Sequence, residues 1–352
     1  MQISALRQQL RALGAKPAHE ARVLRHWARA LPLDLGKPPL AGWLPAPLMA
    51  ALPELLAQWN SQVQLRGEHP ADDGAARLLL GLHDGQTVES VLLPREGVCV
   101  SSQVGCAVGC AFCMTGTEGL IRQVTSGEIV AQVVLARRLR PVRKVVFMGM
   151  GEPSHNLANV LEAIEFLGSE GGLAHKQLVF STVGDERAFE ALHAAPVKPA
   201  LALSLHTTRP DLREQLLPRA PRLTPQRLVE LADAYARATG YPIQYQWTLL
   251  RGVNDSAEEM DAVVRLLAGR YGLLNLILYN EVDGLPFDRP DPASAQTLAR
   301  ALTQRGVLTK LRDSAGQDVE GGCGQLRARE AVGRAGAKRT PMTQPINFQP
   351  RP

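Results

Sequence analysis

The sequence predicts an α/β protein, a partial (β/α)6 barrel preceded by a small N-terminal helical accessory domain. From residue 98 onwards, apolar strand patterns alternate with helical patterns, which is typical of parallel strands joined by crossover helices. Polar residues end several of these strands, at the rim where barrels bind ligands. The first 60 residues carry only short helical patterns.

Length and composition indicate a cytoplasmic globular protein. The 352 residues are 45% hydrophobic and 21% charged, enough for one large core with a small appended domain. We find no apolar run long enough to cross a bilayer, so we expect no membrane association. The N-terminus lacks the apolar stretch of a signal peptide.

We divide the chain into four segments. Residues 1–60 form the helical accessory domain, with helices expected over 3–13, 19–30 and 47–59. Residues 61–97 form a β extension whose two strand patterns are separated by a turn at Asp84-Gly85. Residues 98–326 form the partial barrel. Residues 327–352 form a basic tail that carries the whole net charge of +5, either to touch phosphates or only to solubilise the chain.

The barrel segment contains seven strand patterns and at least four helical ones. Polar residues stand at or just after the ends of these strands: Glu152, Ser181, Ser204, His206 and Asn280. The strands are expected over residues 98–104, 144–150, 176–183, 199–206, 242–250, 273–280 and 306–313. The helices are expected over residues 125–139, 157–168, 224–239 and 293–306.

Three of the five cysteines lie on a short loop directly after the first barrel strand. Cys106, Cys110 and Cys113 follow the spacing C-x3-C-x2-C. Three thiolates leave one iron of a four-iron cluster open, and an open position distinguishes a reactive metal site from a structural one. The alternative is a zinc site with Cys99 or Cys323 as fourth ligand, although zinc sites favour paired C-x2-C spacings.

Several motifs resemble one family, the RlmN/Cfr family of radical S-adenosylmethionine (SAM) adenine methyltransferases. They occur in family order from Glu89 to Leu326, about two-thirds of the chain: CVSSQVGCAVGCAFCMTG, TSGEIVAQV, VVFMGMGEPSHNLANV, STVG, LALSLHTTRPDLREQLLP, GVNDSAEE and GCGQL. The resemblance implies a partial barrel of the radical SAM type. It also implies a [4Fe-4S] cluster on Cys106, Cys110 and Cys113, two SAM molecules per turnover and an electron donor.

The resemblance also implies a set of contacts to SAM: Gly151, Glu152, Ser181, Ser204, Leu205, His206 and Asn280. Without it, the MGMGEP segment at 148–153 would be read as a tight turn between a strand and a helix. Asn280 is followed by Glu281-Val282 where the family has Pro-Phe, so the neighbouring substrate-facing loop departs from the family pattern.

Three further residues are expected to be catalytic. The glycines that flank Cys323 in GGCGQL leave its sulfur accessible, which favours a reactive thiol. Cys99 would be a core cysteine by spacing alone, since unpaired cysteine is usually buried. The resemblance implies that Cys323 carries the methyl group and that Cys99 forms a transient disulfide with it. It further implies that Glu89 accepts a proton.

The expected function is methylation of an adenine carbon in ribosomal RNA, transfer RNA or both. Carbon 2 is the expected position and carbon 8 the alternative, because the two activities of the family share every catalytic residue named above. Such an enzyme must unstack its target base. We expect a monomer. From a different class, the alternative is a non-catalytic RNA-binding protein stabilised by zinc.

Overall fold

The computed structural model describes residues 1–34, 36, 38–282 and 284–328. A ten-stranded sheet runs in the order β1-β2-β3-β4-β7-β8-β9-β10-β11-β12. Within this sheet the seven strands from β4 to β12 are parallel to one another, whereas β4 pairs with β3 in the antiparallel sense. Their bounds are Gly97–Cys99 (β4), Lys144–Phe147 (β7), Leu178–Thr182 (β8), Ala200–Ser204 (β9), Ile243–Leu249 (β10), Gly272–Leu278 (β11) and Thr309–Arg312 (β12).

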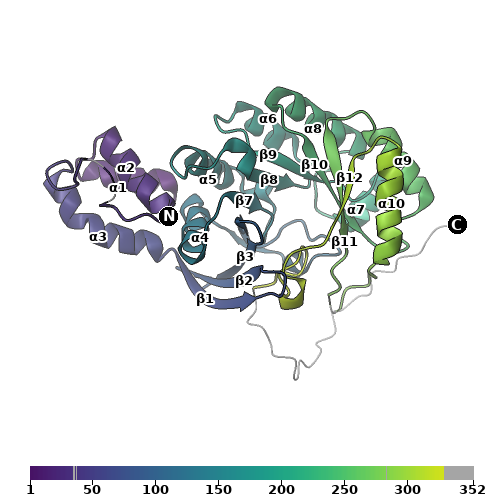
Figure 1. Ribbon diagram of the computed structural model, residues 1–352, viewed down its shortest axis with the longest axis horizontal. Helices are drawn as coiled ribbons and strands as arrows, with labels where there is room; N and C mark the ends of the chain where they lie inside the picture. The colour runs from purple at the N-terminus through teal and green to yellow at the C-terminus, as the bar shows by residue number, and fades with distance from the viewer. Residues whose placement is uncertain (35, 37, 283, 329–352) are drawn as a thin grey trace, which may run out of the picture.

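The parallel strands form an open barrel. Six crossovers join the seven strands, and within the described residues β12 pairs only with β11, so the sheet does not close on itself. The helices of the crossovers cover its outer face (Figure 1). They are Ser126–Leu139 (α4), Leu157–Ser169 (α5), Glu186–Ala194 (α6), Pro210–Leu216 (α7), Pro225–Thr239 (α8), Ala257–Leu267 (α9) and Pro292–Gln304 (α10). The predicted α/β partial barrel is confirmed.

Side-chain caps fix where most crossover helices begin. The side-chain oxygens of five N-cap residues accept hydrogen bonds from amides of the first turn: Thr125, Asp185, Thr224, Ser256 and Asp291. Each cap lies beyond the end of the strand before it, so each helix starts near the rim of the barrel. These capping residues therefore fix the point at which each of the five helices begins after its strand.

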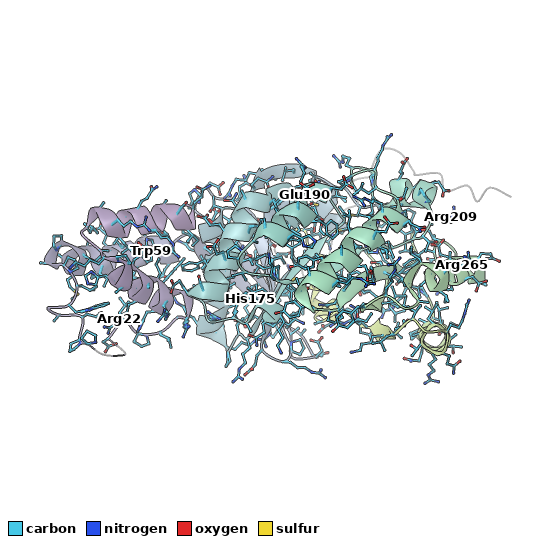
Figure 2. All side chains as sticks on the ribbon, turned by 90° about the horizontal axis from the view of Figure 1, so that it is seen from above. Arg22, Trp59, His175, Glu190, Arg209 and Arg265 are labelled. Carbon is cyan, nitrogen blue, oxygen red and sulfur yellow. The ribbon has the colours of Figure 1, made fainter. Side chains whose placement is uncertain are left out.

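Three helices precede the barrel: Ile3–Ala12 (α1), Pro17–Ala28 (α2) and Ala46–Asn60 (α3). They lie side by side at one end of the molecule, next to α4 and α5 (Figures 1 and 2). The Trp27 ring packs edge-on against Trp59, with centroids 5.4 Å apart, and lies 6.1 Å from Phe166 of α5. Because these helices share one apolar core with the barrel, the domain boundary at residue 60 stays a prediction.

An antiparallel extension joins the helices to the barrel. Strands Val63–Pro70 (β1), Ala76–Leu82 (β2) and Thr87–Leu93 (β3) pair in order and end on β4. The predicted turn at Asp84-Gly85 is present, with Gly85 at φ +86°. The sequence did not indicate β1, because its side chains are mostly exposed and polar.

The first predicted barrel strand is broken in two. β4 ends at Cys99, and Gln103–Gly105 forms β5, which pairs with Leu120–Gln123 (β6) in a separate ribbon. The side chain of Gln132 accepts from the amide of Ser101 and donates to its carbonyl, both at 2.9 Å. This buried amide replaces strand pairing at Ser101 and lets the chain turn into the cysteine loop. Among the helices of the described residues, we find none long and apolar enough to cross a membrane.

Candidate active site

A cavity opens at the carboxyl ends of the parallel strands and gathers most of the predicted site residues. The cavity has a volume of about 150 Å³ and is partly open to solvent. The predicted residues that line it come from five separate segments: Cys106, Cys110, Cys113, Gly151, Glu152, Ser181, Ser204, His206 and Cys323.

The cysteine loop is compact because two of its glycines permit close backbone contact. A Cβ on Gly116 would come within 2.6 Å of the Gly109 Cα, and Gly109 itself has φ +65°. The amide of Cys106 donates to the carbonyl of Gly119 at 2.9 Å. The amide of Ala111 donates to the carbonyl of Leu216 at 2.9 Å, which ties the loop to α7.

The three loop thiols form a donor set suited to an iron–sulfur cluster. Burial raises the pKa of all three, that of Cys106 to about 12, and Cys106 and Cys110 each interact electrostatically with Cys113. Burial therefore disfavours the charged thiolate form of these cysteines, and bound cationic iron would favour that form again. In the described part of the chain no three His, Cys, Asp or Glu side chains are grouped to hold a single metal ion. In an iron–sulfur cluster each thiolate binds a different iron atom, so the three thiols do not have to meet at one metal ion.

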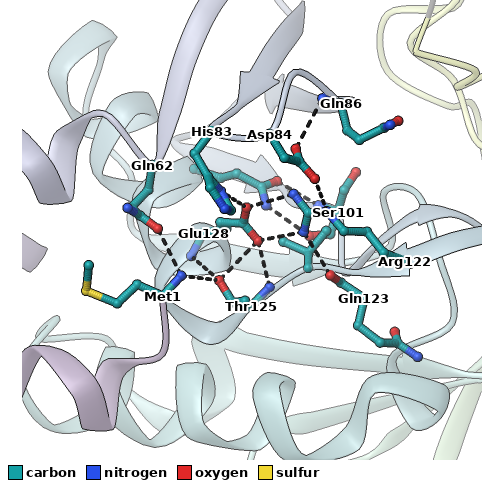
Figure 3. Close-up of polar contacts among 12 residues, drawn as sticks. Met1, Gln62, His83, Asp84, Gln86, Ser101, Arg122, Gln123, Thr125 and Glu128 are labelled. Carbon is teal, nitrogen blue, oxygen red and sulfur yellow. Dashed lines mark hydrogen bonds and ion pairs between the residues drawn. The ribbon is translucent and has the colours of Figure 1, made fainter.

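A buried carboxylate anchors the β5–β6 ribbon, whose two strands precede and follow the cysteine loop (Figure 3). Glu128, at the start of α4, is ion-paired with Arg122 of β6 at 2.9 Å and contacts His83 at 3.0 Å. Arg122 also pairs with Asp84 in the turn between β2 and β3, at 2.6 Å. This network fixes the β5–β6 ribbon, and therefore the start of the cysteine loop, against the β extension and α4.

Glu152 presents a fixed carboxylate to the cavity. The amide of Ser154 donates to one carboxylate oxygen and the amide of Val183 to the other, both at 3.0 Å. Its own amide donates to the side chain of Gln103 at 2.8 Å. A Cβ on Gly151 would come within 2.5 Å of the Gln103 side chain, so this glycine is needed for the contact with β5. The role of Gly151 as a SAM contact stays a prediction.

His206 is a neutral, orienting side chain. It is 6% exposed and its Nδ1 accepts from the amide of Thr248 at 2.9 Å, so the neutral ring carries its proton on Nε2. Burial, with the nearby Arg213 guanidinium, lowers the pKa of His206 to about 3. Ser181 and Ser204 also line the cavity, and their hydroxyls make no hydrogen bond within the described residues. These three side chains can therefore donate to a bound molecule.

Cys323 reaches the same cavity from the far end of the chain. It follows a short 3-10 helix, Gln317–Val319 (η4), and its thiol is exposed to the cavity. The protein atoms around this thiol partly exclude water and so raise its pKa, although a hydrogen bond with Ser314 opposes the shift. The amide of Met114 donates to the carbonyl of Gly324 at 2.8 Å, and the Thr115 hydroxyl donates to the carbonyl of Leu326 at 2.8 Å.

Four predicted site residues do not line the cavity. Cys99 is buried in β4 but interacts electrostatically with Cys323, and burial raises the pKa of its thiol to about 12. The side chain of Asn280 donates to the carbonyl of Cys323 at 2.9 Å, while its buried Oδ1 has no hydrogen-bond partner among the residues that the structure describes. The amide of Leu205 donates to the carbonyl of Gln246 at 3.0 Å. Glu89 is buried in an ion pair with Arg77.

Sequence reasoning missed several polar residues of the site. Gln246 and Thr248 of β10 line the cavity, and the buried guanidinium of Arg213 donates to the carbonyls of Ser204 and Leu205 at 3.0 and 2.7 Å. Arg213 and Gln103 both stand inside motifs that carried the resemblance, which was the available signal. Strand positions such as Gln246 carried no signal, because only the barrel geometry shows which strand face meets the cavity.

Residues 100–267 match the radical SAM superfamily. This match covers the cysteine loop and the strands that carry Glu152, Ser181, Ser204 and His206. The open barrel and a three-cysteine loop at its rim thus define a protein of the radical SAM class. A [4Fe-4S] cluster and SAM are the cofactors of this class, and the donor set described above fits them.

Close relatives extend across nearly the whole chain. A probable RNA methyltransferase of Leptothrix cholodnii is 66% identical over 330 residues, which cover 94% of this chain and 95% of the relative. One from Aromatoleum aromaticum is 68% identical over 329 residues, covering 94% and 93%. A radical SAM methyltransferase structure from Sphaerobacter thermophilus matches with a TM-score of 0.81 and 34% identity, covering 94% and 98%. The chain belongs to this family of radical SAM methyltransferases.

Proposed function

We propose that this protein methylates an adenine carbon in ribosomal or transfer RNA, carbon 2 in preference to carbon 8, as members of the RlmN/Cfr family do. The observation that carries the proposal is the position of Cys323, whose thiol lines the same cavity as the three loop cysteines. The names of the relatives support RNA as the substrate. They also favour an enzyme over a non-catalytic zinc protein.

The cofactors would occupy the cavity between the cysteine loop and the strand ends. Cys106, Cys110 and Cys113 would hold the cluster, while Glu152 and the cavity-facing side chains Ser181, Ser204 and His206 would contact SAM. When bound, the cluster and SAM supply a carbon-centred radical, which a ring carbon too electron-poor for polar methyl transfer requires. Gly151, Leu205 and Asn280 would also contact SAM. Gly151 lines the cavity, Leu205 lies between two residues that line it, and Asn280 donates to the carbonyl of Cys323.

Cys323 would carry the methyl group between the cofactor and the base. Its thiol would receive that methyl group and give up its own proton, and two SAM molecules would supply the methyl group and the radical that activates it. Once the methyl carbon is joined to the base, Glu89 would accept the proton that leaves the ring carbon. Cys99 would then attack the sulfur of Cys323, so that a disulfide forms, the sulfur–carbon bond breaks, and the released carbon keeps the electron pair and takes up a proton. An external thiol reductant would restore the two cysteines. The electrostatic influence of Cys323 on the pKa of the Cys99 thiol supports this pairing, because it requires the two thiols to lie near each other.

The RNA substrate must adapt to the position of Cys323 in the cavity. An adenine must leave its stack to reach Cys323, as for other enzymes that modify bases. The cluster needs an external electron donor. We infer a monomer that acts in the cytoplasm, with residues 1–60 as an accessory domain. The predicted basic tail at 327–352 lies outside the described residues except for Arg327 and Ala328.

Mass analysis of nucleosides tests this function. RNA from cells that lack the protein should lack one methyladenosine, and anaerobic, cluster-loaded protein with SAM and a reductant should restore it to that RNA. The Cys323→Ala variant should keep its cluster and restore nothing. If the protein restores 8-methyladenosine, the position that it methylates is carbon 8 and not carbon 2. Activity in the Cys323→Ala variant would reject Cys323 as the methyl carrier.

A further inference from the structure

A buried ion pair lies beside the segment that carries Cys323. The side chains of Arg77 and Glu89 are 3% and 1% exposed, and an Arg77 guanidinium nitrogen contacts a carboxylate oxygen of Glu89. Arg77 of β2 stands opposite Val91 of β3, and Val91 stands opposite Cys99 of β4. Residues directly opposite in antiparallel strands share a face, as do residues two apart in one strand. Arg77, Glu89 and Cys99 therefore lie on one face of the sheet.

The pair binds the segment on both sides of Cys323. The Nε of Arg77 donates to the carbonyl of Val319 at 2.6 Å. The amide of Arg327 donates to the second carboxylate oxygen of Glu89 at 2.9 Å. Val319 lies four residues before Cys323 and Arg327 four residues after it, so the two contacts close a loop with Cys323 at its centre.

Energy alone does not explain this arrangement. A buried ion pair often stabilises a fold no better than apolar side chains of the same size, because both charges lose their hydration. Other side chains also hold the ends of the segment. A buried bond joins Thr115 to Leu326, and exposed or half-buried bonds join Asp72 to Asp318, Asp73 to Gly316 and Thr87 to Ala328. The pair lies on the same face of the sheet as Cys99 and is bonded to both ends of the Cys323 loop. It therefore fixes the position of that loop relative to Cys99.

We propose that Arg77 and Glu89 form a clamp that holds Cys323 beside Cys99 and the cluster cysteines, with Arg77 as a positioning residue. The inference rests on the proposed function for its catalytic meaning, but the clamp itself does not depend on methyl transfer. It also gives Glu89 a second role, because both of its carboxylate oxygens already accept hydrogen bonds from the protein.

The reactivity of two thiols tests the clamp in anaerobic, cluster-loaded protein. In Arg77→Met, alkylation of Cys323 should rise several-fold, while formation of the Cys99–Cys323 disulfide by a small-molecule disulfide should fall several-fold. Peptide mass spectrometry reads both, and iron content should not change. Arg77→Lys, which keeps the charge, should restore part of both effects. Arg143→Met is the control, because it removes an exposed pair with Glu96 on the adjoining segment.

Unchanged reactivity of both thiols in folded Arg77→Met would overturn the clamp. A general loosening of the fold is recognised by simultaneous loss of iron and alkylation of the buried Cys99, which would also reject a specific clamp. If Arg77→Met does not fold, the double variant Arg77→Met/Glu89→Leu removes both charges and should show the same two changes. Normal thiol behaviour in a wild-type protein that methylates no RNA would reject the proposed function and leave the clamp intact.

Discussion

The carbonyl oxygen of Gly324 accepts a hydrogen bond of 2.8 Å from the amide of Met114. Gly324 directly follows Cys323, and Met114 directly follows Cys113 of the cysteine loop. The bond therefore joins the proposed methyl carrier to the proposed cluster site through main-chain atoms. Its position cannot vary with side-chain rotamers, so the two sulfur sites keep a fixed relation.

We expect Gly324→Ala to disturb this relation. Gly324 has φ +85°, and an added Cβ would lie 3.0 Å from the carbonyl oxygen of Phe112 in the cysteine loop. Gly306→Ala is the matched control, because Gly306 has φ +88° and no neighbour within 4 Å of an added Cβ. Each variant should lose about 1–2 kcal/mol of unfolding free energy through backbone strain. Only Gly324→Ala should also alter the alkylation rate of Cys323. Equal rates in both variants would contradict the contact.

His206 should make the protein less stable at low pH. Its folded-state pKa is lowered to about 3 by burial and by Arg213, below its ordinary value of 6.5. Between these values the unfolded chain binds a proton that the folded chain does not, so stability falls as pH falls below 6.5. The contribution is about 1.4 kcal/mol per pH unit within that window.

The His206→Asn variant should lack this contribution, and asparagine tolerates the φ of +61° found at this position. Denaturant unfolding of both proteins at pH 5 and pH 7.5 measures it. The stability difference between wild type and variant should shrink at the lower pH. A difference that stays constant would show that the pKa of His206 is not lowered in the folded protein.

Removal of the Arg122 side chain should lower the free energy of unfolding more than removal of an arginine from an exposed ion pair. In Arg122→Met, the Glu128 side chain, which is 0% exposed, loses its guanidinium partner (Figure 3). Burial alone would raise the pKa of Glu128, and the bonds from Arg122 and Thr125 outweigh it in the native protein. Loss of one member of a fully buried pair costs about 3–5 kcal/mol, and we expect the lower end of that range because Arg122 is 24% exposed. Denaturant unfolding should show such a loss, whereas Arg143→Met, in an exposed pair, should lose about 0–1 kcal/mol. Equal losses would mean that the network does not anchor the ribbon.

The sequence predicted the parts of the molecule that have a local pattern. Alternating strands and helices gave the barrel, and the C-x3-C-x2-C spacing gave the three cysteines that line the cavity. It did not reveal β1, whose exposed polar residues lack alternation, nor the break at Ser101, where a side chain from α4 replaces strand pairing. Such contacts join residues far apart in the chain and leave no local signal.

The same limit applies to Asn280 and Glu89. Both were expected from the resemblance, as a cofactor contact and as a proton acceptor. In the structure Asn280 donates to the carbonyl of Cys323, and Glu89 accepts from the amide of Arg327. Their catalytic roles stay predictions. Only the folded chain brings them to the Cys323 segment.

Mass spectrometry of the peptide that contains Cys323 tests the central claim most directly. Cluster-loaded protein is incubated anaerobically with a reductant and with SAM that carries an isotope label in its methyl group, without RNA, and is then digested. The account predicts one labelled methyl group on the sulfur of Cys323 and none on Cys99. Label on another residue, or on no cysteine while the cluster is intact, would contradict it.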